Sequence, residues 1–273
     1  MGDIQAKMLL GKEVASSLET TYKLEVDRLL NNGIVPGLAV ILIGSNAASK
    51  VYVRSKARYF EKMKCYSETF TFDDNLNEVD ILNLISKLNV NNKFHGILVQ
   101  LPIPRHIDES KILKAINPKK DVDGFHPMNF GKLFQGQPVF VPCTPNGIMK
   151  MIDYYGFTME GKNVVILGRS NIVGKPMFAL LSQKFKNGNA TVTLCHTGTP
   201  DMTIYTKNAD VIIVAVGQPK LLKKDMVKDG VILIDVGINR VDDNSEKGYR
   251  LVGDIDFESV KSVAKAITPV PGG

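Results

Sequence analysis

The sequence predicts an α/β fold made of two domains, each a parallel sheet flanked by helices, with a cleft between the domains. Apolar runs of strand length alternate with segments of helical periodicity along the 273-residue chain. A chain of this length more often buries two medium-sized cores than one large core. A proline-rich segment at 138–145 interrupts the alternation, as expected between two domains.

The first half contains strands separated by helices. Its helices are predicted at 11–30, 47–63, 77–88 and 110–116, and its strands at 38–43, 67–72 and 96–101. Strand–helix–strand units place their strands parallel, and ligands bind at the carboxyl ends of such strands. We therefore expect a ligand near the residues that follow Ile43 and Val99, and around 121–126.

The second half is more regular. A connecting helix is predicted at 147–155, before strands at 164–167, 191–194, 211–216 and 231–235. Helices fit between most of these strands. This pattern is typical of a dinucleotide-binding domain, so the second domain is predicted to be Rossmann-like.

A glycine loop follows the first strand of that domain. Gly168 permits a tight turn at the strand end, and Gly174 permits close approach of a ligand at the helix start. The loop is not GxGxxG, because Ser170 replaces the middle glycine and the spacing is longer. It is not a P-loop either, because Pro176 stands where a magnesium-binding hydroxyl is needed. Such a glycine is more often part of a simple turn, but the strand–helix context favours a cofactor site.

The choice of cofactor depends on the end of the second strand. An NAD site usually has an acidic residue there, whereas residues 195–199 contain none. Arg169 could face a 2′-phosphate and Thr197 could donate a hydrogen bond to it, which favours NADP over NAD. A solvated surface charge is the equally weighted alternative for Arg169.

Composition excludes several other classes of protein. The net charge is +6, but basic and acidic residues are interspersed and no nucleic-acid-binding motif is present. Three separated cysteines and four histidines show neither CxxC nor HExxH spacing, so no metal site is expected. The apolar runs are too short to span a bilayer, and the N-terminus lacks the pattern of a signal peptide. We expect a cytoplasmic protein that binds neither nucleic acid nor membrane.

Tyr52 and Lys56 lie one helical turn apart in the predicted helix 47–63 and share a face. The helix is rich in basic residues, so a solvated face is the simpler interpretation from the pattern alone. However, the helix follows a buried strand and begins at its ligand-binding end. Short-chain dehydrogenases also contain Tyr-x-x-x-Lys, but their glycine loop precedes the pair. Here the order is reversed, which makes that family unlikely.

The complete set of motifs resembles the bifunctional methylenetetrahydrofolate dehydrogenase/methenyltetrahydrofolate cyclohydrolase family, over about residues 11–273. The motifs that carry the resemblance are SKVYVRSK at 49–56, GILVQLP at 96–102, KDVDGFHP at 120–127, PCTP at 142–145, GRSNIVG at 168–174, DVGIN at 235–239 and TPVPGG at 268–273. Family members usually continue past this Pro-Gly-Gly, so the sequence is consistent with a shortened chain.

The resemblance implies two reactions of one-carbon metabolism that serve purine biosynthesis. The first is NADP-dependent oxidation of 5,10-methylenetetrahydrofolate, and the second is hydrolysis of the methenyl product to 10-formyltetrahydrofolate. It also implies a homodimer. Residues 1–145, completed by 266–273, would form the catalytic and folate-binding domain, and residues 146–265 the NADP-binding domain.

The resemblance also implies roles for individual residues. Lys56 would be the catalytic lysine, Tyr52 would stack on or orient the folate ring, Gln100 would contact Lys56, and Asp123 would hold the pterin. The implied substrate-binding set is Tyr52, Val53, Arg54, Ser55, Lys56, Val99, Gln100, Leu101, Asp123, Pro271, Gly272 and Gly273. The implied cofactor-binding set is Thr144, Gly168, Arg169, Ser170, Thr197 and Ile238.

These roles are chemically reasonable. Loss of hydride leaves a methenyl cation, which a protonated lysine would oppose, whereas a neutral Lys56 could take a proton from the attacking water. Asp123 could accept two parallel N–H bonds from a pterin, or it could be a turn or cap residue within Asp-Val-Asp-Gly. A dehydrogenase without hydrolase activity and a dinucleotide-binding protein without catalysis are the rival hypotheses. Intact polar residues at Lys56, Gln100 and Asp123 argue against both.

Overall fold

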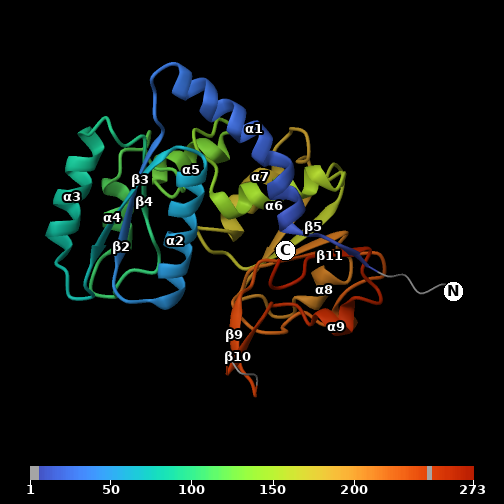
Figure 1. Ribbon diagram of the computed structural model, residues 1–273. Coiled ribbons are helices and arrows are strands. Elements are labelled where there is room, and N and C mark those ends of the chain that lie inside the picture. The colour runs from blue at the N-terminus through green and yellow to red at the C-terminus, as the bar shows by residue number, and fades with distance from the viewer. Residues whose placement is uncertain (1–5, 245–247) are drawn as a thin grey trace. The chain divides into compact units, whose positions relative to one another are not determined.

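The computed structural model describes residues 6–244 and 248–273. The chain divides into two compact units, one formed by Met1–Ser16 with Cys143–Gly273 and the other by Ser17–Pro142. Helix α1 (Gly11–Asn31) begins in the first of these units and continues in the second. Both units contain a parallel sheet and helices, which confirms the predicted α/β class (Figure 1).

The Ser17–Pro142 unit contains a three-stranded parallel sheet in the order β3-β2-β4. The strands are β2 (Gly37–Ile43), β3 (Tyr66–Phe72) and β4 (Gly96–Val99). Strand β2 pairs with both neighbours, from Gly37↔Tyr66 on one side and Leu38↔Gly96 on the other. All residues of β2 are buried, as its unbroken apolar run predicts for a central strand.

Helices cover both faces of this sheet, because alternate residues of β2 point to opposite sides. Figure 1 shows α2 (Ala47–Lys62) on one side of the strands and α3 (Glu78–Val90) on the other. The α2 side buries Leu38, Val40, Leu42, Val53 and Leu98. The opposite side buries a larger cluster that includes Ile81 and Ile85 of α3 and Ile112 of α4 (Glu109–Ala115).

Helix α5 (Pro127–Phe134) also belongs to this unit and was not predicted from the sequence. Pro127 occupies its first turn, where the missing N–H has no consequence. The His126 side chain caps the helix by accepting a hydrogen bond from Met128 N at 3.0 Å. The helix has only eight residues, too few for a periodic pattern to stand out.

The other unit contains a six-stranded parallel sheet in the order β1-β11-β8-β7-β5-β6. Its strands are β1 (Lys7–Met8), β5 (Asn163–Leu167), β6 (Thr191–Cys195), β7 (Val211–Val214), β8 (Ile232–Asp235) and β11 (Ala266–Ile267). Its helices are α6 (Cys143–Tyr154), α7 (Gly174–Ser182), α8 (Thr203–Thr206), α9 (Phe257–Val260) and the 3₁₀ turn Lys224–Met226. An antiparallel hairpin is formed by β9 (Asn239–Asp242) and β10 (Tyr249–Val252).

The division of the chain differs from the expected domain boundaries in three respects. Met1–Ser16 were expected in the first domain but group with Cys143–Gly273. Residues 266–273 were expected to complete the first domain, but β11 lies between β8 and β1 in the six-stranded sheet. Main-chain bonds extend this pairing, with Leu9 N donating to Ile267 O and Gly11 N to Gly272 O, both at 2.9 Å. The units also divide after Pro142 rather than Pro145, because α6 already begins at Cys143.

Within residues 6–244 and 248–273, no helix is long and apolar enough to cross a membrane. The same residues contain no group of three or more His, Cys, Asp or Glu side chains placed to hold a metal ion.

Candidate active site

Gln100 follows the carboxyl end of β4, where the parallel sheet leads us to expect a ligand. Its backbone N–H donates to Ile41 O at 2.9 Å, which extends the β4–β2 pairing by one residue. Its side-chain amide donates to Leu101 O at 2.9 Å. The amide plane is therefore fixed, and the remaining oxygen, Oε1, is directed at another group.

That group is Lys56, whose Nζ donates to Gln100 Oε1 at 3.1 Å. Lys56 lies in the middle of α2 and is half-buried. Helix α2 is held against the sheet by buried Val53, and Asn46 caps its start by accepting from Ser49 N at 3.0 Å. Among the residues that the structure describes, no carboxylate pairs with Lys56.

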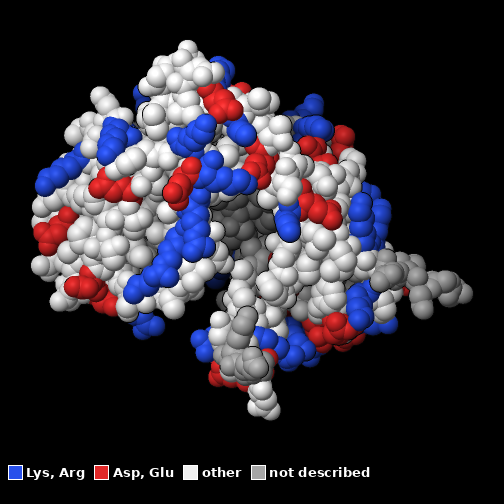
Figure 2. Space-filling view, in the orientation of Figure 1, with Lys and Arg blue, Asp and Glu red and all other residues white. Residues whose placement is uncertain are grey.

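Lys56 differs from the other basic residues of its helix. Figure 2 shows a band of Lys and Arg on the surface that α2 forms, and α2 carries Lys50, Arg54, Arg58 and Lys62 at i, i+4 spacing. Lys62 pairs with Glu19 on the exposed surface. At 3.6 residues per turn, Lys56 lies about 160° around the helix from Arg54 and Arg58. The interpretation as a solvated face thus suits these four basic residues and not Lys56.

Tyr52 lies one turn before Lys56 and is 51% exposed. Its hydroxyl forms no hydrogen bond within the described part of the chain. An exposed aromatic ring next to a half-buried lysine is available to stack on a planar ligand.

Asp121 and Asp123 have different roles in the Asp-Val-Asp-Gly segment. Asp121 is buried beside β4, where it forms a parallel bridge with Ile97. Its carboxylate accepts from three donors, which are Phe125 N at 3.2 Å, His126 N at 2.8 Å and Asn129 Nδ2 at 2.8 Å. Asp121 thus fixes the start of α5 through its side chain. Asp123 is half-buried and follows in the direction of the carboxyl end of β4.

The other predicted substrate-binding residues have varied surroundings. Arg54 and Ser55 are exposed on α2, and Leu101 is half-buried. Val53 and Val99 have buried side chains that pack in the core, so only their main-chain atoms can face a ligand. Pro271, Gly272 and Gly273 are exposed and belong to the other compact unit.

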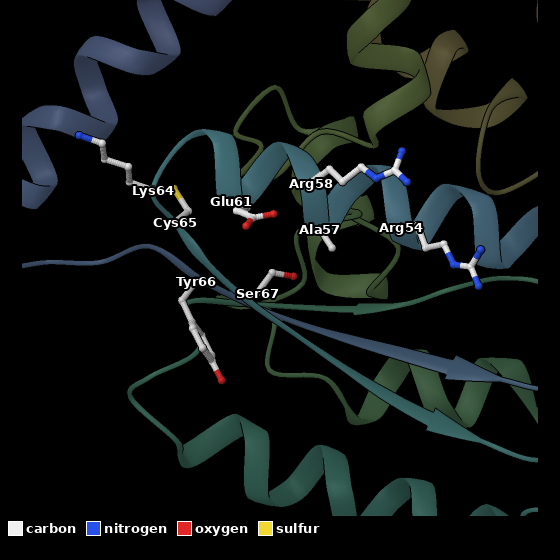
Figure 3. A pocket seen from close by; sticks show the side chains of 8 residues that line it. All are labelled: Arg54, Ala57, Arg58, Glu61, Lys64, Cys65, Tyr66 and Ser67. Atoms are coloured by element: carbon white, nitrogen blue, oxygen red, sulfur yellow. The ribbon is translucent and has the colours of Figure 1, made fainter.

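A surface hollow of about 640 Å³ lies in the Ser17–Pro142 unit between α2 and the edge strand β3. Figure 3 shows Ala57 and Glu61 of α2 above Ser67 of β3. The lining residues are Arg54, Ala57, Arg58, Glu61, Lys64, Cys65, Tyr66 and Ser67. Lys56 and Gln100 do not line this hollow, so it is separate from the pair described above.

The glycine loop of the other unit follows β5 and is tightly packed. Gly168 has a φ of +112°, and a Cβ at this position would overlap Ala215 O. A Cβ at Gly174 would overlap Gly168 O at the start of α7. Ser170 Oγ accepts from Val173 N at 3.1 Å and Gly174 N at 3.4 Å, which closes the turn. The N–H groups at the start of α7 thus already have acceptors inside the loop, since Lys175 N also donates to Ser170 O at 3.1 Å.

The predicted cofactor-binding side chains of this unit are each exposed. Arg169, Thr197 and Thr144 are exposed, and Ile238 is 58% exposed. Arg169 forms no ion pair with any described residue. An unpaired guanidinium next to the glycine loop can bind a phosphate in bidentate fashion.

Two carboxylates lie at the carboxyl ends of β7 and β8 and were given no role from the sequence: Asp235, which is half-buried, and Asp254, which is fully buried. Asp235 Oδ1 accepts from Gly237 N and Asp254 N, both at 3.0 Å, and its Oδ2 accepts from Ile255 N at 2.8 Å. Burial raises the pKa of the Asp235 carboxyl to about 6, and the nearby Asp254 carboxylate acts in the same direction. Asp235 belongs to the DVGIN motif at 235–239, whereas the Gly253-Asp254 pair resembles an ordinary turn.

The chain matches two family models. Residues 9–123 match the tetrahydrofolate dehydrogenase/cyclohydrolase catalytic domain, and residues 142–273 match the NAD(P)-binding domain of the same family. The bifunctional protein FolD of Nautilia profundicola is 50% identical over 266 residues, which cover 97% of this chain and 90% of that protein.

Two solved structures are also similar to the chain. The bifunctional enzyme FolD (methylenetetrahydrofolate dehydrogenase/cyclohydrolase) from Campylobacter jejuni has 47% identity and a TM-score of 0.92. The Trypanosoma brucei methylenetetrahydrofolate dehydrogenase-cyclohydrolase, complexed with NADP cofactor and inhibitor, has 36% identity and a TM-score of 0.92. Each comparison covers 98% of this chain and 92% of the other chain.

Proposed function

The chain belongs to the tetrahydrofolate dehydrogenase/cyclohydrolase family, and on this premise we propose which of its residues serve the two reactions of the enzyme. The first reaction is the NADP-dependent oxidation of 5,10-methylenetetrahydrofolate. The second is the hydrolysis of 5,10-methenyltetrahydrofolate to 10-formyltetrahydrofolate. The chain is thus an oxidoreductase and a hydrolase of one-carbon metabolism.

The observation that carries the assignment of the hydrolytic step is the bond from Lys56 Nζ to Gln100 Oε1 at 3.1 Å. A neutral amine that donates one N–H to Gln100 keeps its lone pair for another proton. Lys56 takes that proton from the water that attacks the methenyl carbon, so a hydroxide equivalent adds to the cation. Gln100 positions Lys56 and is itself fixed by its bond to Leu101 O.

The folate ring is recognised by residues on the same unit. The exposed ring of Tyr52 stacks on the pterin system, and Asp123 accepts the amino and ring N–H groups side by side. These contacts hold the reacting carbon near Lys56, which converts attack of water into a step between pre-oriented groups. Arg54, Ser55, Leu101 and the main chain of Val53 and Val99 complete the contacts.

The cofactor is held by the glycine loop of the other unit. NADP⁺, when bound, accepts the hydride that leaves the methylene carbon. Gly168 and Gly174 let this loop pack tightly against Ala215 O and Gly168 O, because neither position tolerates a Cβ. Ser170, Thr144 and Ile238 line the same site, and Arg169 with Thr197 binds the 2′-phosphate. Arg169→Gln should therefore lower kcat/KM for NADP⁺ but leave that for NAD⁺ unchanged, and a clear preference of the native enzyme for NAD⁺ would contradict this assignment.

One assay distinguishes the bifunctional enzyme from its rivals. The absorbance of methenyltetrahydrofolate is followed without NADP⁺, and formation of methenyl product from methylenetetrahydrofolate is followed with NADP⁺. The bifunctional enzyme catalyses both changes. A dehydrogenase alone hydrolyses methenyl substrate no faster than buffer, and a non-catalytic dinucleotide-binding protein accelerates neither reaction.

We further propose a homodimer in the cytoplasm that supplies one-carbon units to purine biosynthesis, which the family resemblance supports. Light scattering after size exclusion should give a mass of about twice the 30.1 kDa of one chain. A mass that stays at that of one chain across the accessible concentration range would contradict the dimer.

A further inference from the structure

Asp254 is completely buried, and its carboxylate connects three separate segments of the chain. Its Oδ2 accepts from Val216 N at 2.7 Å and Gly217 N at 2.9 Å, in the loop that follows β7. Its Oδ1 accepts from Asn239 Nδ2 at 2.8 Å, at the end of the loop that follows β8. One side chain therefore holds both of these loops.

The loop after β8 approaches the Asp254 carboxylate closely at Gly237. A Cβ at Gly237 would overlap the Asp254 carboxyl group, so the loop after β8 can lie here only because this residue is glycine. Asp254 is itself held in place, because its backbone N–H donates to Asp235 Oδ1 at 3.0 Å. The loop therefore fits against the carboxylate at Gly237, and the Asp235 bond fixes the main chain of Asp254.

Both loops contribute to the proposed cofactor site. The loop after β7 contains Ala215, whose carbonyl oxygen lies against Gly168 so closely that no Cβ fits between them. The loop after β8 contains Ile238, which precedes Asn239 and is exposed. A shift of either loop would move the surface against which the dinucleotide lies.

Charge-assisted hydrogen bonds are the type of contact that can hold such loops. An ionised carboxylate that accepts three N–H bonds away from solvent holds its donors more strongly than neutral acceptors do. Loops of small and exposed residues, such as Val216 and Gly217, have few packing contacts of their own. Their conformation thus depends on the acceptor beneath them.

From these contacts we propose that Asp254 is a positioning residue for the NADP site, which acts through the loops that contain Val216, Gly217 and Ile238. The inference rests on the proposed function, because it concerns the same cofactor. It assigns no contact between Asp254 and the dinucleotide. It predicts that weakening this carboxylate lowers affinity for NADP⁺ and leaves hydrolysis, which needs no NADP⁺, unchanged.

The test compares the dissociation constant for NADP⁺, measured by calorimetry, with the kcat and KM of methenyltetrahydrofolate hydrolysis. Asp254→Asn should raise the dissociation constant about tenfold, because an amide cannot accept from all three donors. Asp242→Asn is the matched control, since it removes the same charge from an exposed position on β9 of the same unit. That control should bind NADP⁺ as the native enzyme does.

A second substitution provides the rescue. In Asp254→Asn/Asn239→Asp the side-chain amide and the carboxylate exchange places. The side-chain amide at position 254 can then donate to the carboxylate at position 239. We expect the double variant to recover most of the lost affinity. A general loss of structure in Asp254→Asn would not be repaired in this way.

Asn239→Ala keeps the test decisive even if Asp254→Asn does not fold. It removes one of the three donors and leaves the buried carboxylate paired with Val216 N and Gly217 N. Weaker NADP⁺ binding with native hydrolysis supports the inference. Native NADP⁺ affinity in this variant overturns it, and so does a parallel loss of binding and hydrolysis. If the native enzyme itself fails to bind NADP⁺, the proposed function fails first.

Discussion

The half-buried Asp235 carboxyl should make the stability of its unit depend on pH. Three main-chain N–H groups donate to it, which favours its ionised form. Burial and the nearby Asp254 carboxylate act in the opposite direction and prevail, so its pKa rises from 3.8 to about 6. Because the folded state binds this proton more tightly than the unfolded state, protonation stabilises the fold. The stabilisation is complete below about pH 4 and is lost as the pH rises through about 6.

The magnitude follows from linkage. At about 1.4 kcal/mol per pKa unit, the shift corresponds to about 3 kcal/mol over the full titration. Between pH 7 and pH 5, the linkage equation gives a gain of about 1.3 kcal/mol in the free energy of unfolding. Asp235→Asn cannot titrate and lacks this gain. The difference in stability between native protein and variant should therefore shift by about 1.3 kcal/mol in favour of the native protein at pH 5.

The assay must report on the correct unit, because the two units can unfold in separate transitions. Urea unfolding is therefore followed by pulsed alkylation of Cys195, which is buried in the same core. Asp242→Asn provides a control for the loss of a single exposed carboxylate in that unit. A difference that is equal at both pH values, or that favours the variant at pH 5, would refute the reasoning.

Two further predictions concern packing and access. Gly253→Ala should destabilise its unit by about 1–3 kcal/mol, because the new Cβ overlaps Asp235 Oδ2. In contrast, the new Cβ of Gly131→Ala in α5 meets open space, so this variant should stabilise its unit by about 0.5–1 kcal/mol. Urea midpoints measure both, and equal effects would contradict the packing argument. In the native protein, iodoacetamide should modify exposed Cys143 before Cys65 and Cys195, because burial raises the pKa of the latter two thiols and restricts access. Peptide mass spectrometry gives the order, and labelling of Cys195 as fast as that of Cys143 would contradict the described core.

The sequence predicted those elements whose pattern is strong on its own. Strand β2 was correct to within one residue, because the unbroken apolar run 38–43, between Pro36 and Gly44, is typical of a buried strand. Helix α2 was likewise correct to within one residue, since apolar positions and a capping Asn46 mark its start. The elements that were missed are short or depend on distant partners. Strands β1 and β11 have two residues each and exist only because they pair with each other and with β8.

The candidate site was predictable to different degrees. The positions of Gln100 and the glycine loop follow from the rule that ligands bind at the carboxyl ends of parallel strands. The contact between Lys56 and Gln100 joins residues 44 positions apart, and only the family resemblance anticipated it. Asp254 was missed because its donors, Val216 and Gly217, lie 38 and 37 residues away. No local pattern distinguishes such a carboxylate from one in a surface turn.

The most direct test of the account is the rate of methenyltetrahydrofolate hydrolysis by Lys56→Met in the absence of NADP⁺. Lys62→Met is the matched control, because Lys62 lies on the same helix, is exposed and pairs with Glu19. If Lys56 takes the proton from water, Lys56→Met should hydrolyse methenyltetrahydrofolate no faster than buffer, while the control keeps the native rate. Both variants should bind NADP⁺ as the native enzyme does. Hydrolysis by Lys56→Met at the native rate would contradict the role assigned to this lysine.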